Sequence, residues 1–241
     1  MCAALKESDA YHWKRVPWIY TVVMSTDTGE CLNAGTFSQW LSSMRDVLRG
    51  DRDADVPCGD CVGCCVSSYP IPLRLGDTVA REQVPEGRLI GPARPGEPWL
   101  MGYADDGSCP FLLEQRCSIY GQRPQTCRDY DCRIYTAAGL VPDGNRPVIA
   151  GRVKAWQFTF DSEQDLQEAQ AVGRAAHFIR TNQTLFPPGM RAGSATAAAV
   201  LAIKTYPVFL VAEQAASPEQ MARRVMDAAR LFDQGFAQTR T

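Results

Sequence analysis

The chain has 241 residues, a length that suits one domain or one domain with a sizeable appendage. Its hydrophobic content of 45% and its charged content of 22% are ordinary for a soluble globular protein. The formal net charge of −2 provides no electrostatic footprint for nucleic acid or an anionic membrane, so we expect neither as a partner.

The first residues and the longest apolar stretch both argue against export. Residues 1–23 carry several charges and lack the apolar core of a signal peptide. The apolar stretch 195–212 is interrupted by Lys204 and Pro207 and is too broken to span a bilayer. We therefore expect a cytoplasmic protein, whose thiols are kept reduced; in an exported chain the ten cysteines could instead form disulfides.

The segment 1–23 also differs in character from the residues after it. Its aromatic residues are crowded among charges, whereas a cleaner polar segment starts at Met24. We hypothesise that Met24 is the native start and that residues 1–23 are an upstream extension, in which case Cys2 is irrelevant to function.

One helix is expected in the N-terminal segment 1–57. Thr36 or Ser38 can cap it, and Gly50 ends it. Its apolar residues recur at helical spacing: Phe37, Leu41, Met44 and Leu48. A charged linker, residues 51–55, then leads to the cysteines.

An irregular loop and short strands are expected next. Residues 85–98 are rich in proline and glycine and should form a long loop. Strands are expected at 99–103 and within 111–120, where a tight hairpin would place Cys109 and Cys117 near its two ends.

Pro124 should start a helix that carries Cys127 in its first turn, where N–H donors favour a thiolate. Cys132 lies five residues further on, and on an ideal helix the two side chains diverge by about 140°. Either the helix ends near Tyr130, or the two sulfurs serve different sites. On these grounds we expect Cys127 to be the better ligand.

The region 161–241 contains no cysteine and changes to alanine-rich helix. Ser162 with Asp165 forms a capping-box-like start, a second helix is expected around 193–206, and Ser217 starts a third. Apolar stripes are predicted on the first and third helices: Leu166, Ala169, Val172, Ala176 and Ile179, and Met221, Val225, Ala228 and Phe232. We expect these helices to form a scaffold beside the cysteine-bearing part.

Eight of the ten cysteines fall in one part of the chain. They are Cys58, Cys61, Cys64, Cys65, Cys109, Cys117, Cys127 and Cys132. Packing does not explain the first four, which lie within eight residues, because a core uses buried cysteines one or two at a time. Thiolates at two-residue spacing lie on a tight turn that brings the sulfurs together, so we interpret all eight as metal ligands. Cys2 and Cys31 lie outside the cluster and are not expected to be ligands.

Histidine is nearly absent, since His12 and His177 are the only two in the chain. His12 lies in the proposed upstream extension and His177 on a predicted helix. Neither a zinc site with histidine ligands nor a histidine base is therefore expected, and the predicted metal chemistry is all-thiolate.

Two metals suit four thiolates. Structural zinc usually draws its ligands as two separated pairs. Cubane-type iron–sulfur clusters use a Cys-x2-Cys-x2-Cys run and a remote cysteine often followed by proline, a pattern matched by Cys58 to Cys64 together with Cys109. We therefore favour a 4Fe-4S cluster, with zinc as the alternative.

Cys65 leaves the number of metal sites open. Adjacent side chains point apart in extended backbone, so Cys64 and Cys65 rarely bind one ion together. Eight thiols suffice for two four-thiolate sites, or for one site with spare thiols.

A four-thiolate site is negatively charged and needs cations or N–H donors nearby. Four arginines lie within four residues of a cysteine: Arg116, Arg123, Arg128 and Arg133. They either offset this charge or form a solvated face.

The cysteine-bearing segment resembles a known family. The residues that carry the resemblance are Cys58-Gly-Asp-Cys61-Val-Gly-Cys64-Cys65, Cys109-Pro-Phe-Leu, Cys117-Ser-Ile-Tyr and Arg123-Pro-Gln-Thr-Cys127-Arg up to Cys132. All eight cysteines match the pattern of the CxxCxxCC cysteine-cluster family (YkgJ-type), described as zinc- or iron-chelating proteins. The resemblance covers Cys58 to Cys132 and implies a metal cluster in a bacterial cytoplasmic protein, with no settled reaction.

A similar cysteine pattern occurs in flagellin lysine methylases, which would imply S-adenosylmethionine and protein modification. Against that, the sequence offers no glycine-rich nucleotide loop after a convincing strand, since the segment 91–96 is too rich in proline.

We therefore expect an α+β fold, mainly helical by residue count, with a small irregular cysteine-organised metal core and C-terminal helices. The expected domains are the N-terminal segment 1–57, a cysteine-cluster metal-binding domain at 58–160, and a helical region at 161–241 that packs on it. The first functional hypothesis is an iron–sulfur protein with a redox or protein-modification role and an unknown protein or redox partner. The second is a zinc-stabilised structural or interaction module without catalysis.

Overall fold

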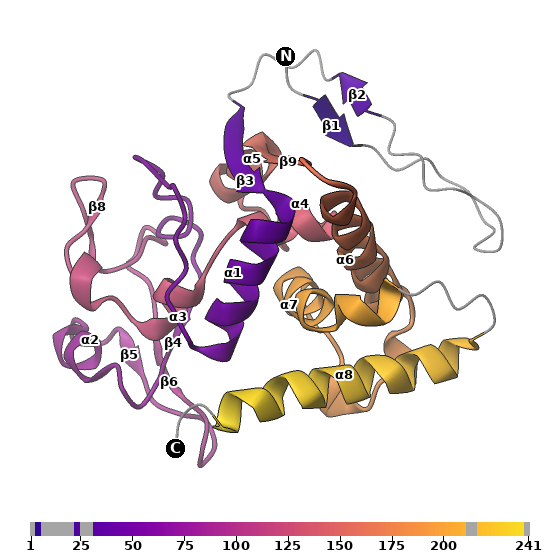
Figure 1. Ribbon diagram of the computed structural model, residues 1–241. Coiled ribbons are helices and arrows are strands. Elements are labelled where there is room, and N and C mark those ends of the chain that lie inside the picture. Colours follow the sequence, from indigo (N-terminus) through magenta and orange to yellow (C-terminus); the bar gives the residue numbers. More distant parts are fainter. Residues whose placement is uncertain (1–2, 6–21, 25–30, 211–215, 239–241) are drawn as a thin grey trace. The chain divides into compact units, whose positions relative to one another are not determined.

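The computed structural model describes residues 3–5, 22–24, 31–210 and 216–238 of the chain (Figure 1). The hypothesis that residues 1–23 are an upstream extension concerns a stretch that lies largely outside these described residues. Within the described part, no helix is both long and apolar enough to cross a membrane.

Helices account for 50% of the residues and strands for 10%, and the strands form several small sheets. This confirms the expected α+β fold with C-terminal helices. The chain divides into two compact units. Unit 1 combines residues 1–45, 133–143 and 153–241, and unit 2 combines residues 46–132 and 144–152. The free cysteines among the described residues all lie in unit 2.

Unit 1 is built mainly from helices. Its elements are β1 (Ala3–Leu5), β2 (Val22–Met24), β3 (Leu32–Thr36), most of α1 (Phe37–Arg49), α4 (Arg133–Ala138), β9 (Trp156–Thr159), α6 (Glu163–Thr181), α7 (Ala195–Thr205) and α8 (Pro218–Gln238), with 3-10 turns at Gln183–Leu185, Pro188–Met190 and Tyr206–Phe209. β1 pairs with β2 in antiparallel fashion. β3 pairs with β9 in parallel, although about 120 residues separate the two strands in the sequence.

α1 confirms the first predicted helix. It ends at Arg49, and Gly50 follows with a φ of 76°, a conformation that favours glycine. The Gly50 N–H donates to the Val47 carbonyl at 2.9 Å. The chain then turns into the linker expected at 51–55.

α1 and α6 are joined at their first turns. Ser162 caps α6 and accepts a hydrogen bond from the Asp165 N–H at 3.2 Å, while the Asp165 carboxylate accepts from the Ser162 N–H at 2.8 Å. The same carboxylate accepts from the Ser38 N–H of α1 at 2.9 Å. The predicted capping box is confirmed, and Asp165 also links two helices that no sequence pattern connects.

The core of unit 1 is made largely by alanine-rich helices. α6 and α7 pack against each other, and their buried faces consist mainly of alanine, including Ala175 and Ala198 (Figure 1). Small side chains let two helices approach closely, so that dispersion contacts accumulate between them. Aromatic rings pack where α1 meets β9, with the Phe37 and Phe158 ring centroids 5.0 Å apart.

The predicted apolar stripes were wrong at three positions. On α6, Leu166 is 42% exposed. On α8, the structure buries Ala222 and Ala229, each one residue away from the predicted Met221 and Ala228. Alanine suits any position of a helix, so an alanine-rich segment defines its buried face poorly.

Unit 2 consists of short elements around a small core. Its elements are the end of α1, β4 (Ile71–Leu73), α2 (Thr78–Gln83), β5 (Leu89–Ile90), β6 (Trp99–Met101), β7 (Leu112–Leu113), β8 (Arg116–Cys117), α3 (Gln125–Asp129) and most of α5 (Pro147–Ala155), with a 3-10 turn at Tyr120–Gln122. β4, β6 and β5 form one antiparallel sheet in that order, and β6 confirms the strand expected at 99–103. Leu73, Met101 and Phe111 form a buried core cluster.

The hairpin expected within 111–120 is confirmed as β7 and β8, with Leu112 opposite Cys117. Its two turn residues, Glu114 and Gln115, have φ values of 46° and 61°. A two-residue turn of type I′ requires this left-handed conformation at both positions. Side chains other than glycine and asparagine rarely adopt it, so the pairing of the flanking strands must stabilise the turn.

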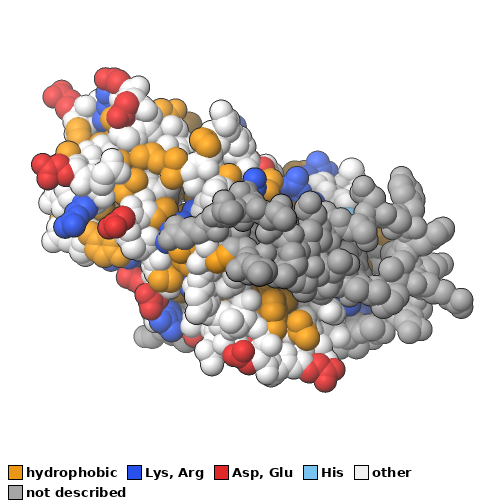
Figure 2. All heavy atoms as spheres, turned by 90° about the horizontal axis from the view of Figure 1, so that it is seen from above, with side chains coloured by type: hydrophobic (Ala, Val, Ile, Leu, Met, Phe, Trp, Pro, Cys, Tyr) orange, Lys and Arg blue, Asp and Glu red, His pale blue; other side chains and the backbone are white. Residues whose placement is uncertain are grey.

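Charges are mixed on the face of the molecule seen in Figure 2. Among the described residues visible there, Lys and Arg side chains are scattered among Asp, Glu and hydrophobic side chains, and no large patch of one sign forms. This face therefore lacks the single-sign field that steers a strongly charged partner.

Candidate metal centre

The cysteine loop, residues 57–67, consists of two consecutive tight turns. The Cys61 N–H donates to the Cys58 carbonyl at 3.0 Å and closes the first turn, in which Gly59 has a φ of 55°. The Cys65 N–H donates to the carbonyl three residues earlier at 2.8 Å and closes the second turn. These turns fold the loop compactly, as the two-residue spacing predicted.

A backbone hydrogen bond joins this loop to the segment that leads into the hairpin. The Cys109 N–H donates to the Cys65 carbonyl at 2.6 Å. Cys109 precedes β7, Cys117 ends β8, and both side chains pack against the core cluster of unit 2. The fold therefore places Cys109 next to the second turn of the cysteine loop, with Cys117 nearby on the hairpin.

α3 carries Cys127 as expected. Pro124 precedes the helix, and Cys127 is its third residue, with its N–H bonded to the Pro124 carbonyl at 2.9 Å. The helix ends at Asp129, because Tyr130 is extended with a ψ of 123°. Of the two alternatives left open by the sequence, the structure therefore shows that the helix ends near Tyr130. Cys132 lies beyond it, is buried, and immediately precedes α4.

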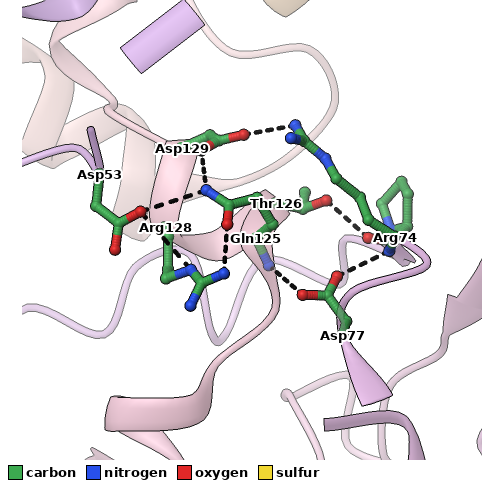
Figure 3. Close-up of polar contacts among 8 residues, drawn as sticks. Asp53, Arg74, Asp77, Gln125, Thr126, Arg128 and Asp129 are labelled. Carbon is green, nitrogen blue, oxygen red and sulfur yellow. Dashed lines mark hydrogen bonds and ion pairs between the residues drawn. The ribbon is translucent and has the colours of Figure 1, made fainter. Parts of the chain in front are cut away.

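A polar network holds α3 against the segment around β4 and the start of α2 (Figure 3). The buried Asp77 carboxylate accepts hydrogen bonds from the backbone N–H groups of Gln125 and Arg74, each at 2.8 Å. The Thr126 hydroxyl donates to the Pro72 carbonyl at 2.7 Å. Asp77 thereby satisfies the first N–H group of α3, for which the helix itself offers no acceptor.

Further contacts tie α3 to the linker that precedes the cysteine loop. Arg128 pairs with Asp53 at 3.7 Å, and the Ala54 N–H donates to the Arg128 carbonyl at 2.8 Å. At the other side of the helix Asp129 pairs with Arg74 (Figure 3). Protein contacts on both sides of α3 thus set the position of the Cys127 backbone.

Five thiols lie close enough to influence one another's ionisation, and we call them the five-thiol group: Cys64, Cys65, Cys109, Cys117 and Cys127. Burial, followed by three neighbouring thiols of this group, raises the pKa of Cys127 to about 12. This corrects the expectation that the helix start favours a thiolate there. Burial and the neighbouring thiols outweigh the N–H donors of a short helix and the opposing charge of Arg123.

The adjacent thiols Cys64 and Cys65 differ in their ionisation. A hydrogen bond between the two side chains lowers the pKa of Cys64 to about 7 and raises the pKa of Cys65. Burial adds to the rise at Cys65, as do the nearby Cys109 and Cys117. Burial is also the first cause of the raised pKa of Cys109. Of the two thiols, Cys64 is therefore the more readily ionised.

Cys58 and Cys61 adjoin the five-thiol group through Cys64. Burial, then Cys64 and Cys61, raise the pKa of Cys58 to about 11, and the Arg152 guanidinium opposes this rise. The Cys61 sulfur accepts a hydrogen bond from the Gly63 N–H at 3.4 Å. Seven of the predicted ligands therefore lie in one neighbourhood of unit 2, and the eighth, Cys132, is a buried residue of the same unit.

These sulfurs are neighbours without converging on a single point. Among the described residues, no three Cys, His, Asp or Glu side chains lie close enough together to hold one metal ion. Which of the eight cysteines are ligands therefore stays a prediction. The donor set fits the predicted metals, since zinc and iron–sulfur clusters both take four thiolates.

Of the four residues that were not expected to be ligands, two belong to unit 1 and two lie outside the described residues. Cys31 forms a disulfide and is not a free thiol. His177 is an exposed residue of α6 in unit 1. Cys2 and His12 lie outside the described residues. Unit 2 contains no histidine at all, so any metal centre within it has no imidazole ligand.

The arginines expected near the thiols divide into two kinds. Arg123 lowers the pKa of Cys64 and opposes the rise at Cys127. Arg128 instead pairs with Asp53, and Arg133 donates to a backbone carbonyl of β3 in unit 1. Of the arginines close to a cysteine in the sequence, Arg123 is therefore one that favours ionisation of the thiols.

Three residues that contact the cysteine-bearing segments were missed in the sequence: Asp77, Arg146 and Arg152. Asp77 anchors α3, and the two arginines bond the backbone of the cysteine loop. Arg152 follows the last cysteine by 20 residues and Asp77 follows Cys65 by 12. No spacing relates them to a ligand pattern, so the sequence contains no signal that would have found them.

Comparisons with known proteins bear on the cysteine-bearing part of the chain. A search of curated proteins and a search of solved structures each returned no match. Residues 57–146 match the model of the CxxCxxCC family, described as a "Putative zinc- or iron-chelating domain", which confirms the resemblance over the clustered cysteines and supports metal binding by them.

Proposed function

We propose that unit 2 is a metal-binding module with an all-thiolate centre, and that this centre is a 4Fe-4S cluster with a redox or protein-modification role. One observation carries the proposal: three segments far apart in the sequence meet at their cysteines. They are the cysteine loop, the segment of Cys109 and Cys117, and α3 with Cys127. A metal centre would add a direct link between these segments, of which only that of Cys109 and Cys117 has residues packed against the core cluster of unit 2.

The electrostatics of the five-thiol group also suit a cation. Ligating sulfurs are thiolates, and the raised pKa values of Cys65, Cys109 and Cys127 make thiolates unfavourable there without a compensating charge. A metal cation supplies that charge. Arg123 and Arg152, which favour ionisation of nearby thiols, would offset the net negative charge of a four-thiolate centre.

The choice of an iron–sulfur cluster rests on spacing. Cys58, Cys61 and Cys64 offer three ligands on one loop, and Cys109, which precedes a proline, offers the remote fourth. The bond from the Cys109 N–H to the Cys65 carbonyl brings this remote cysteine to the loop. A bound cluster would supply one-electron transfer, while the protein sets its position and its exposure to a partner.

A protein or redox partner is part of this proposal. Cys58 and Cys64 are exposed, so a centre that uses them would lie near the protein surface. A reducing cytoplasm is the compartment in which free thiols of this number are expected.

Zinc is the second candidate, and the hairpin favours it. Cys61 and Cys64 form one pair at two-residue spacing, and Cys109 and Cys117 on the hairpin form a second pair close to Cys64. Structural zinc usually takes its four ligands as two separated pairs. Unit 2 would then be a zinc-stabilised structural or interaction module without catalysis.

Metal analysis of the full-length protein, purified without oxygen, distinguishes the candidates. We expect a brown protein with about four iron and four acid-labile sulfide per chain. A colourless protein with stoichiometric zinc would support the second candidate. A protein that contains neither metal, and takes up neither when reconstituted, would contradict both.

A further inference from the structure

The segment 144–152 belongs to unit 2 although it contains no cysteine and follows a stretch of unit 1. It comprises the first two thirds of α5 and the three residues before that helix. Its side chains contact the cysteine loop at three places: the beginning, the middle and the end. These contacts are the basis of the inference.

Arg152 holds the beginning of the loop. Its Nη2 donates to the Pro57 carbonyl at 3.1 Å and to the Cys58 carbonyl at 2.9 Å. A guanidinium can bond two adjacent carbonyls with fixed geometry, because its N–H donors lie in one plane. Arg152 therefore holds the backbone carbonyls of the first cysteine and of the residue before it.

Gly63 places the middle of the loop against α5. A methyl group added at Gly63 would lie 3.4 Å from the Cys61 sulfur, 3.5 Å from the Val148 side chain and 3.5 Å from the Ile149 backbone. Ordinary van der Waals distances of this kind leave room for a methyl group and for nothing larger. The close approach of the loop to α5 thus depends on a small residue at this position.

Arg146 holds the end of the loop. Its Nε donates to the Ser67 carbonyl at 2.9 Å, and its guanidinium lies 4.0 Å from the centre of the Tyr69 ring. The Ser67 hydroxyl in turn donates to the Gly63 carbonyl. The end and the middle of the loop are therefore bonded to each other and to the same segment.

The geometry points to the segment 144–152 as a clamp that holds the cysteine loop in its metal-binding conformation, with Arg146 and Arg152 as positioning residues. The role of the clamp in metal binding rests on the proposed function. Its effect on the conformation of the cysteine loop does not depend on a bound metal. Arg152 lies beyond residues 57–146, the part that matches the family model, so the family resemblance does not assign it this role.

Arg152→Gln tests the clamp, and Arg94→Gln is the matched control. Arg94 is an exposed arginine of unit 2, so its substitution removes the same charge at a distance from the loop. Hydrogen exchange of residues 57–67 is measured in the full-length protein, with metal bound and after chelation. We expect exchange about tenfold faster in Arg152→Gln than in wild type, because two hydrogen bonds to the loop are lost. Residues 109–118 and the Arg94→Gln protein should exchange as in wild type.

Two further measurements separate positioning from general loss of stability. Metal loss to a chelator should be about tenfold faster in Arg152→Gln, as is usual when a residue that orients a ligand is removed. Arg152→Lys should restore exchange in part, since it keeps the charge and a donor but loses the planar geometry. If Arg152→Gln does not fold, Gly63→Ala and Gly63→Val serve instead, with faster loop exchange expected in the valine variant alone.

Unchanged loop exchange in Arg152→Gln, or the same change in Arg94→Gln, would overturn the clamp. So would equal exchange in the two Gly63 variants. A wild-type protein that binds no metal would contradict the proposed function and leave the exchange measurement to decide the clamp by itself.

Discussion

Cys64 lies between Cys58 and Cys61 of the cysteine loop and the other members of the five-thiol group. It is the first neighbouring thiol to raise the pKa of Cys58 in the cysteine loop, and it also raises the pKa of three thiols of the five-thiol group: Cys65, Cys109 and Cys127. Among the predicted ligands, Cys64 is therefore the one whose neighbours include thiols of both the loop and the hairpin.

We predict that Cys58→Ser, Cys61→Ser and Cys64→Ser each lower the metal content of the protein, with the largest loss in Cys64→Ser. A serine hydroxyl is a poor substitute for a thiolate ligand, so each variant should bind the metal less tightly. A weaker metal site also stabilises the folded state less. Iron and zinc are measured per chain in protein prepared without oxygen. Cys31→Ser should keep the wild-type content, because Cys31 is not a free thiol. Full occupancy in all three loop variants would show that the site is elsewhere.

α3 depends on its neighbours at the scale of the element. It has five residues, and an isolated helix of this length is unstable in water. Asp77 and Thr126 anchor one side of it and Arg128 the other. The position of Cys127 is therefore set by a polar network that the metal does not supply.

Asp77→Ala should lower the free energy of unfolding by about 1–3 kcal/mol, because the partly buried N–H groups of Arg74 and Gln125 lose their buried acceptor. Urea unfolding of the full-length protein, followed by circular dichroism, measures the effect. Asp105→Ala is the control, since its side chain is 94% exposed and its ion pair with Arg88 contributes about 0–1 kcal/mol. Equal losses in the two variants would mean that the anchor of α3 is unimportant.

The first turn of α6 provides a prediction about pH. Hydrogen bonds from Ser162, then from Ser38, hold the pKa of Asp165 well below its ordinary value. A lowered pKa in the folded state means that the carboxylate stabilises the protein above the unfolded pKa of about 3.9. This contribution is lost as the pH falls through the lower, folded value.

We therefore predict that Asp165→Asn lowers the free energy of unfolding by about 1 kcal/mol at neutral pH, with a smaller difference from wild type in acid. Urea unfolding at pH 7 and at pH 3 measures both values. Glu163→Gln changes an exposed residue of the same turn and should have little effect at either pH. An effect of Asp165→Asn that is the same at both pH values would contradict the electrostatic explanation.

Across the whole molecule, local features could be predicted and distant ones could not. The end of α1 at Gly50, the capping box at Ser162 and the break near Tyr130 each depend on residues within one or two turns. The metal-binding character of the cysteines likewise follows from their spacing and is supported by the family match.

The pairing of β3 with β9 and the contacts of Arg152 lack such a signal. A parallel strand pair joins segments far apart in the sequence, and its partner is chosen by the packing of the whole unit. Arg152 bonds backbone carbonyls, which every residue carries, so its partners could not be read from side-chain types. The positions of the sulfurs in unit 2 depend on backbone contacts of this second kind, so the spacing of the cysteines predicted which groups could bind a metal but not their geometry.

The two units differ in what stabilises them. Unit 1 contains packed helices with fully buried apolar side chains such as Val172 and Ile203. The core cluster of unit 2 consists of Leu73, Met101 and Phe111. Since hydrophobic stabilisation grows with the apolar area buried, at about 25 cal/mol per Å², a small cluster contributes little and unit 2 should depend more on its metal.

We predict that removal of the metal by a chelator loosens unit 2 and leaves the helices of unit 1 unchanged. Hydrogen exchange in the full-length protein should become at least about tenfold faster in residues 57–67 and 109–118, because the free energy of metal binding is free energy of folding for the segments that hold it. The amides of α6 and α7 should keep their wild-type rates, since apolar packing protects them. Returning iron with sulfide, or zinc, should restore slow exchange in the cysteine segments. If chelation accelerates exchange equally in α7 and in the cysteine loop, or in neither, the metal is not what stabilises unit 2.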